Sequence, residues 1–285
     1  MQITPEARAF NTRPNTVDHD RVGSLQYLGN YERRLPVNME RMLENALDWE
    51  HLPHMHASSF ADIACIDSGG WGWRAVARPT GEQAQEQVLE LLVDRERNYW
   101  ATTILTGAIA GIEIHTQAEA VSDSAVDIDV RFLSAQPLAQ ELAELFLSGL
   151  QQQYAVLYDE DVALMSGRQA ALDDRERWRT AQATRVLVGD VAALRATGIA
   201  TAECGGGRFC VRWSGSDWIV HSAVCTHLLG PLDGELNTDG SVTCPWHGFH
   251  FDVVTGENLD GGCRALAQAP LVEEEAGKLY LVPRL

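Results

Sequence analysis

The sequence lacks any long hydrophobic run. No stretch approaches the roughly 18–20 consecutive apolar residues of a membrane-spanning helix. The N-terminal residues MQITPEARAF also lack the apolar core of a secretory signal. These two absences predict a cytoplasmic protein that has no membrane as a partner.

Positive charge is scarce as well. Lys278 is the only lysine, and the 22 Lys and Arg residues are outnumbered by 40 Asp and Glu, so that the formal net charge is −18. A strongly acidic chain repels phosphate backbones and anionic lipid headgroups. We therefore expect neither nucleic acid nor an anionic membrane surface among its partners.

Cysteine is infrequent, with six residues in 285. Disulfide frameworks are typical of much shorter secreted domains, so this number in a chain of this length does not indicate one. Cys225 and Cys244 belong to a motif described below. We interpret three others that fall outside it as small buried or surface residues: Cys204, Cys210 and Cys263.

The first part of the chain alternates between helical and strand patterns. Residues 36–47 carry apolar side chains at the i, i+3, i+4 spacing of an amphipathic helix. Five segments between residues 71 and 134 predict strands, and in the last of them Val126 and Ile128 alternate with acidic residues, as in an antiparallel sheet with one solvated face. Helical periodicity returns over 138–172. This order predicts an α+β domain in which a long helix packs over an antiparallel sheet.

A change of character follows near residues 173–185, which are charged and poor in apolar side chains. From there onward, short apolar segments alternate with Gly-rich turns, the pattern of a small all-β domain. The predicted domains are therefore residues 1–181 and 182–285.

Two Cys-His pairs stand out in the second part. Residues 225–248 read CTHLLGPLDGELNTDGSVTCPWHG, with Cys225 and His227 in one turn and Cys244 and His247 in the next. Zinc is the alternative, but zinc motifs usually pair Cys with Cys and His with His. One thiolate and one imidazole at each turn suits a [2Fe–2S] cluster with Cys on one iron and His on the other. We predict that these four residues bind such a cluster.

An upstream stretch, residues 45–60, contains three histidines. It reads NALDWEHLPHMHASSF, in which His51 and His56 are five residues apart. In a regular helix these two side chains would point roughly 140° apart, so both can meet one metal only if the helix is broken. Pro53 lies between them and would kink the segment. Two His and one carboxylate form the non-haem Fe(II) sites that activate O2. His54 is a competing ligand, and a polar helix end without metal is the alternative.

The cluster motif resembles that of a known family. The two pairs match the Rieske motif C-x-H…C-x2-H-G, which Gly248 completes, and the β-rich region around it is similar to a Rieske domain. The extra cysteine pair of disulfide-stapled respiratory Rieske proteins is missing from these loops. This favours the lower-potential oxygenase or ferredoxin type.

The upstream stretch resembles the iron helix of Rieske non-haem iron oxygenases, the aromatic-ring-hydroxylating oxygenase alpha subunits. That helix carries N-x2-D-x2-H-x4-H, the spacing of Asn45, Asp48, His51 and His56. The resemblance implies that His51 and His56 bind a mononuclear Fe(II). It also implies that Asp48 links the iron site to a cluster histidine, by position His247, as part of the electron route.

The resemblance places the third iron ligand on the later helix. The segment YDEDVALMSGRQ is similar to the family's ED-x(7)-Q segment, with Glu160, Asp161 and Gln169 in place and Ser166 where a Glu is usual. Asp161 stands at the ligand position. Asp159 and Glu160 remain alternatives, because three successive acids also suit a solvated first helical turn.

The resemblance further implies an N-terminal helix-grip, START-like catalytic domain and a C-terminal Rieske domain, the reverse of the usual order in the family. Electrons would pass from a ferredoxin or flavin reductase through the [2Fe–2S] cluster to Fe(II), and O2 would hydroxylate, demethylate or dihydroxylate a small apolar, aromatic or cyclic substrate. A homo-oligomer, a trimer in the family, is implied too. Apolar residues that could line the substrate pocket, or belong to the core, are Trp71, Trp73, Trp100, Ile104 and Leu105.

One alternative from another functional class is compatible with the same motifs. It is a Rieske electron-transfer protein fused to a START-like domain that binds a hydrophobic ligand and holds no catalytic iron.

Overall fold

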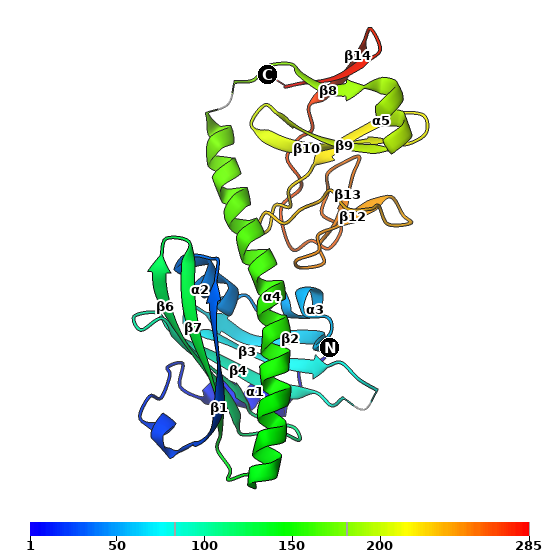
Figure 1. Cartoon of the computed structure of the whole chain (residues 1–285). Helices are drawn as coiled ribbons and strands as arrows, with labels where there is room; N and C mark the ends of the chain where they lie inside the picture. Colours follow the sequence, from blue (N-terminus) through cyan, green and yellow to red (C-terminus); the bar gives the residue numbers. More distant parts are fainter. Residues whose placement is uncertain (83, 181, 285) are drawn as a thin grey trace. The chain divides into compact units, whose positions relative to one another are not determined.

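The computed structural model describes residues 1–82, 84–180 and 182–284. It consists of two compact units, Met1–Ser166 and Gly167–Leu285 (Figure 1). The predicted domain boundary falls on residue 181, which lies outside the described residues, so this boundary stays a prediction.

The first unit is built on a seven-stranded antiparallel sheet with the strand order β1-β7-β6-β5-β4-β3-β2. The five strands predicted between residues 71 and 134 are confirmed as β3 to β7. The two edge strands were not predicted, because their residues are mostly half-buried and show no apolar alternation. The strands are β1 (Gln26–Leu35), β2 (Phe60–Gly69), β3 (Gly72–Pro79), β4 (Gln87–Asp94), β5 (Tyr99–Ile104), β6 (Ile112–Ser122) and β7 (Ala125–Ser134).

Helices cover the inner face of this sheet. Helix α2 (Met39–Leu47) confirms the predicted amphipathic helix, and it begins where the Asn38 side chain accepts a hydrogen bond from the backbone N–H of Arg41. Met42 of α2, Phe132 of the sheet and Met165 of α4 (Gln140–Arg179) are almost fully buried in the shared core. The predicted packing of a long helix over the sheet is thus confirmed for the α4 residues that belong to the first unit.

Helix α4 is 40 residues long and exceeds the predicted range 138–172. It continues to Arg179, through the first part of the charged stretch 173–185 that was expected to separate the two domains. Ion pairs with helical i, i+3 spacing support it there, Asp174 with Arg177 at 3.0 Å and Glu176 with Arg179 at 2.9 Å. None of the helices in the described ranges combines the length and apolar character that a membrane span requires.

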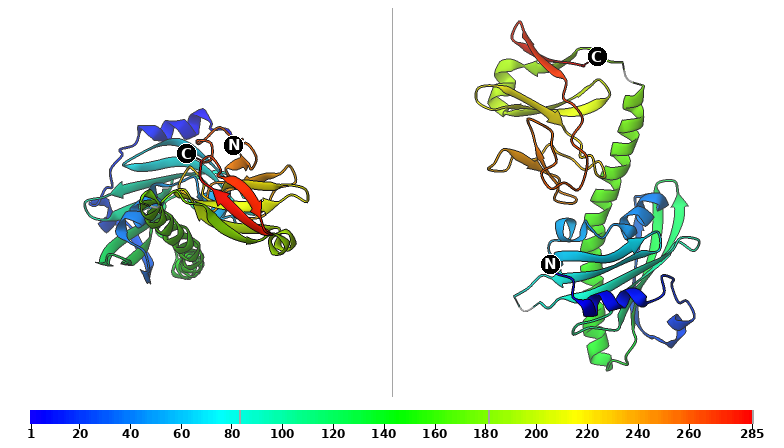
Figure 2. Two further views of the ribbon diagram at one scale, coloured as in Figure 1. Left: turned by 90° about the horizontal axis from the view of Figure 1, so that it is seen from above. Right: turned by 180° about the vertical axis from the view of Figure 1, so that it is seen from behind.

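The N-terminal segment crosses the outer face of the sheet, opposite α4 (Figure 2, right). It comprises α1 (Pro5–Ala9) and the short 3-10 turns η1 (Phe10–Thr12) and η2 (Arg21–Ser24). Ala7 of α1 packs against Val76 and Val88. Ile3 and Phe10 of the segment add to this apolar contact, and polar contacts also hold the segment on the sheet.

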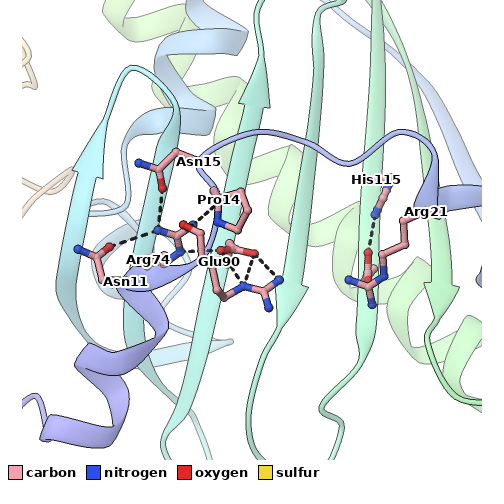
Figure 3. Close-up of polar contacts among 9 residues, drawn as sticks. Asn11, Pro14, Asn15, Arg21, Arg74, Glu90 and His115 are labelled. Atoms are coloured by element: carbon pink, nitrogen blue, oxygen red, sulfur yellow. Dashed lines mark hydrogen bonds and ion pairs between the residues drawn. The ribbon is translucent and has the colours of Figure 1, made fainter.

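Those polar contacts centre on Arg74 of β3, whose side chain is fully buried beside the equally buried Glu90 of β4 (Figure 3). The Arg74 Nε lies 2.5 Å from a Glu90 carboxylate oxygen. The other guanidinium N–H groups donate to four acceptors on the N-terminal segment at 2.7–3.2 Å: the side-chain oxygens of Asn11 and Asn15 and the carbonyl oxygens of Arg13 and Pro14. One buried cation therefore ties the segment to the sheet.

The second unit contains three small antiparallel sheets, ordered β11-β10-β9, β12-β13 and β14-β15-β8. The short apolar segments expected as strands form β8, β10, β11, β12, β13 and β15, whereas β9, β14 and a short helix after β8 were not predicted. The elements are β8 (Val186–Asp190), α5 (Val191–Thr197), β9 (Ile199–Cys204), β10 (Gly207–Trp213), β11 (Trp218–Ser222), β12 (Ser241–Thr243), β13 (His250–Asp252), β14 (Leu271–Glu275) and β15 (Lys278–Val282). Cys204 and Cys210 are buried in this unit, and Cys263 is half-buried.

Candidate functional site

Three candidate metal ligands converge within the first unit. The Nε2 atoms of His51 and His56 are 3.2 Å apart. A carboxylate oxygen of Asp161 lies 3.4 Å from the first and 3.0 Å from the second. All three side chains are buried, and their ligand atoms are close enough to bind one metal ion.

The chain brings the two histidines together by a different route from the predicted one. Helix α2 ends at Leu47, and the short helix α3 (Leu52–Met55) follows with His51 and His56 as its two cap residues. Pro53 lies in the first turn of α3, where its missing N–H costs no hydrogen bond. The predicted break at Pro53 was therefore wrong in position. The direction changes before His51, and His56 leaves the helical conformation at φ −105° and ψ 40°.

Two polar side chains support these candidate ligands. A carboxylate oxygen of Glu160 lies 2.7 Å from Nδ1 of His56. The Asn45 side-chain amide donates to the Asp161 oxygen that faces the histidines, at 3.0 Å. From the sequence, Glu160 was only an alternative ligand, because spacing alone does not show which ring nitrogen an acid contacts.

The other two alternative metal ligands from the sequence, His54 and Asp159, lie outside this group. His54 is exposed and stands outside the group of three. The Asp159 side chain is 66% exposed and pairs with Arg33 at 2.6 Å. Among the histidines and acids considered from the sequence, the group of His51, His56 and Asp161 is the one that the described structure assembles.

Electrostatics at the group favour an ionised carboxylate. Burial opposes a charged imidazole, but the hydrogen bond that His51 donates to Asp161 and the negative charges of Asp161 and Asp48 outweigh it and raise the pKa of His51 to about 10. Burial alone would raise the pKa of Asp161, yet hydrogen bonds from His51 and His56 hold that pKa well below its usual value. Asp48 contributes from behind His51, with 3.6 Å between its carboxylate and Nδ1. Two imidazoles and one carboxylate form a donor set suited to a divalent transition metal.

A cavity adjoins the three residues. It encloses about 700 Å³, including its opening to solvent, and its walls are mainly apolar and aromatic. Trp73 and Trp100 are among the lining residues, whereas the other pocket candidates from the sequence, Trp71, Ile104 and Leu105, are not among them. The Trp73 indole N–H donates to the carbonyl of Ala46 at 3.0 Å, which fixes this wall.

Two further lining residues, Tyr154 and Tyr158, were not predicted. Burial raises the pKa of both phenols. They precede Asp161 by seven and three residues, a spacing that puts all three on one face of α4. This helical spacing was the available signal in the sequence.

The four candidate cluster ligands also come together, within the second unit. Cys225, Cys244 and His247 are buried, and the rings of His227 and His247 have centroids 4.5 Å apart. Hydrogen bonds from the Cys225 thiol and, to a smaller extent, from His247 lower the pKa of Cys244 against the effect of burial. The arrangement is two sulfur donors beside two imidazoles, which fits the donor set of a [2Fe–2S] cluster with mixed ligation.

The backbone at Gly230 approaches this site closely. A Cβ atom there would lie 2.6 Å from Cys244 Sγ and 3.0 Å from the Trp246 ring. Only a residue without a side chain leaves the sulfur accessible to a cluster.

We therefore expect Gly230→Ala to displace the Cys244 side chain and to reduce cluster content by at least half. The absorbance of the cluster relative to protein, measured after purification, tests this. Gly234→Ala on the same loop is a matched control, because nothing lies within 4 Å of a Cβ built there. Equal cluster content in both variants would contradict the steric account.

Comparison with known proteins agrees with the cluster site. A family model described as "Rieske [2Fe-2S] domain" matches residues 184–270. The C-terminal part of the chain therefore contains a Rieske [2Fe–2S] domain, an electron-transfer module whose cofactor is a [2Fe–2S] cluster. No curated protein sequence matches the chain.

Solved structures resemble the two parts separately. The ferredoxin of carbazole 1,9a-dioxygenase from Nocardioides aromaticivorans IC177 is 24% identical, with 35% of this chain and 99% of that one covered and a TM-score of 0.32. The ZhuI aromatase/cyclase from Streptomyces sp. R1128 is 10% identical, with 50% and 95% covered and a TM-score of 0.42. A START superfamily protein from Mycobacterium smegmatis is 12% identical, with 49% and 99% covered and a TM-score of 0.41. The predicted fold class is confirmed as an α+β unit, with a helix packed over an antiparallel sheet, followed by a Rieske domain.

Proposed function

We propose that the chain is a Rieske-type non-haem iron oxygenase. The observation that carries the proposal is the buried group of His51, His56 and Asp161 beside an apolar cavity. Two imidazoles and one carboxylate leave coordination positions open for O2 and substrate. The Rieske domain in the same chain gives this group a source of electrons.

When bound, the [2Fe–2S] cluster supplies single electrons and a mononuclear Fe(II) supplies the activation of O2. The protein would hold the two centres with seven side chains. The cluster ligands would be Cys225, His227, Cys244 and His247, and the iron ligands would be His51, His56 and Asp161.

The other residues of the first unit would position the substrate and exclude water. Trp73, Trp100 and Tyr154 offer flat apolar walls, which suit a small aromatic or cyclic substrate. Asn45 would keep Asp161 oriented through its 3.0 Å hydrogen bond. The reaction would be hydroxylation, demethylation or dihydroxylation, with a ferredoxin or flavin reductase as electron donor.

Asp48 would belong to the electron route. Its carboxylate stands 3.6 Å from Nδ1 of His51 and also lines the cavity. By the family resemblance it would connect His51 with His247 of the same or a neighbouring subunit. That connection stays a prediction.

A second function is supported by the walls of the cavity. They are mainly apolar, so they would bind a hydrophobic ligand even without a metal. The family model also covers only residues 184–270 and therefore supports the cluster domain alone. On this view the chain is an electron-transfer protein fused to a ligand-binding unit.

The iron content of anaerobically purified protein separates the two functions. The oxygenase is expected to contain about three irons and about two acid-labile sulfides per chain, because the mononuclear iron adds to the cluster. The electron-transfer protein would contain about two irons per two sulfides. Normalising iron to sulfide in each preparation controls for partial cluster occupancy. A ratio that stays at about one after reconstitution with Fe(II) would exclude the oxygenase.

A further inference from the structure

We infer that Glu160 is a positioning residue for the metal site, and that it fixes the tautomer of His56 by accepting the Nδ1 proton. The inference rests on the proposed function only in that the group of His51, His56 and Asp161 binds a divalent metal.

The two ring nitrogens of His56 face two consecutive acids of α4. Glu160 lies 2.7 Å from Nδ1 of His56, and Asp161 lies 3.0 Å from its Nε2. The His56 side chain is 2% exposed, and that of Glu160 is 30% exposed. The ring is therefore held from both sides, with one carboxylate buried and the other reached from the surface.

The Glu160 contact decides where the ring proton resides. An ionised carboxylate only accepts hydrogen bonds, so Nδ1 of His56 must carry the hydrogen. When a metal takes the place of the hydrogen bond between Nε2 and Asp161, Nε2 is the ring nitrogen left to bind it, on the side of His51 and Asp161. A carboxylate that accepts a hydrogen bond from a ligating imidazole also makes the other ring nitrogen a stronger metal ligand.

The two histidines are not supported equally. The carboxylate behind His51 belongs to Asp48, at 3.6 Å from Nδ1, which is longer than a normal hydrogen bond. The corresponding distance at His56 is 2.7 Å. Glu160 therefore fixes the orientation of the His56 ring through its Nδ1, whereas the Nδ1 side of the His51 ring has the longer contact.

Glu160 is not itself a ligand in this arrangement. Its carboxylate contacts the ring nitrogen remote from the other donors, and it does not belong to the group whose ligand atoms converge. The imidazole of His56 thus stands between Glu160 and the metal position. The effect of Glu160 must pass through His56.

Cobalt(II) binding provides the test, because the visible absorption of Co(II) reports its ligands without any turnover. Apparent dissociation constants would be measured on the cluster-containing full chain. Glu160→Leu removes the acceptor and is expected to weaken Co(II) binding 10- to 100-fold, the range typical of lost outer-shell partners. Glu160→Gln keeps an acceptor oxygen and loses the charge, so its loss is expected to be smaller than that of Glu160→Leu.

Asp159→Asn is the matched control. It neutralises the adjacent acid of the same helix, whose partner is Arg33 on the surface, and it is expected to leave Co(II) affinity unchanged. The second readout is the ¹⁵N NMR spectrum of the histidines in Zn(II)-loaded protein. The protected Nδ1 proton of His56 is expected in the wild type and in Glu160→Gln, and it is expected to be lost in Glu160→Leu.

The outcomes separate this inference from the proposed function. Equal affinity in Glu160→Leu and the wild type overturns the role of Glu160 while the metal site stands. If Asp159→Asn also weakens Co(II) binding, any lost negative charge on this helix explains the result. The role of Glu160 is then overturned as well. Wild-type protein should bind Co(II), and His51→Ala should abolish that binding. If it does not, both the role of Glu160 and the oxygenase are overturned.

Discussion

Alanine in place of His51 is expected to remove the mononuclear iron and abolish oxygenation while the visible spectrum of the cluster stays unchanged. The His51 ring supplies one of only three converging donors, and it is buried, so no other described side chain is positioned to replace it. The cluster ligands belong to the other compact unit and should be unaffected. Iron per sulfide and substrate-dependent O2 consumption measure the two effects.

His54→Ala is the control for that experiment. His54 lies three residues further along the same segment and is exposed, outside the converging group. Iron content and turnover are expected to match the wild type. If His54→Ala loses the iron and His51→Ala retains it, the assignment of the ligands is wrong.

Methionine in place of Arg74 is expected to destabilise the first unit by about 3–5 kcal/mol, the usual cost of leaving one partner of a buried ion pair uncompensated. Glu90, 1% exposed, would still pair with Arg13, in which a guanidinium nitrogen lies 3.1 Å from the Glu90 carboxylate. The four hydrogen bonds to the N-terminal segment would be lost at the same time. Hydrogen exchange of peptides from β3 and β4, together with urea unfolding, measures the change for this unit separately.

Arg34→Met is the matched control, since it also breaks an Arg–carboxylate pair. Arg34 contacts Asp127 at 2.7 Å through two nitrogens, but both side chains are well exposed. Exposed pairs contribute about 0–1 kcal/mol, so the two variants should differ several-fold. The double variant Arg74→Met with Glu90→Leu should recover part of the loss, because no buried charge is then left unpaired. Similar small losses in Arg74→Met and Arg34→Met would refute the anchoring role.

The parts of the fold that sequence patterns predicted are those in which burial repeats with a regular period. In β7, Val126 and Ile128 are almost fully buried and alternate with acids, so the strand could be recognised. The edge strands β1 and β2 have no such period, and register shifts interrupt the pairing of both. Arg74 could not be recognised as a buried anchor, since its partners come from β4 and from the distant N-terminal segment.

The candidate site was also only partly predictable from the sequence. The cluster and iron ligands stand in short motifs, so their spacing was sufficient to propose them. The support of His56 by Glu160 depends on which ring nitrogen faces α4, which spacing does not encode. Pro53 was a misleading signal, because proline is well tolerated in a first helical turn and the backbone from His51 to Met55 stays helical.

Tyr154, Tyr158 and Asp161 share one face of α4. A helix moves as a stiff rod, so a shift along its axis displaces the two phenols and the carboxylate together by the same amount. A bulky molecule that pushes this wall outward would also pull the oxygen donor away from the imidazoles. Variants intended to accept larger compounds should therefore alter Trp100 or Leu91, which line the cavity from the sheet and belong neither to α4 nor to the group of His51, His56 and Asp161.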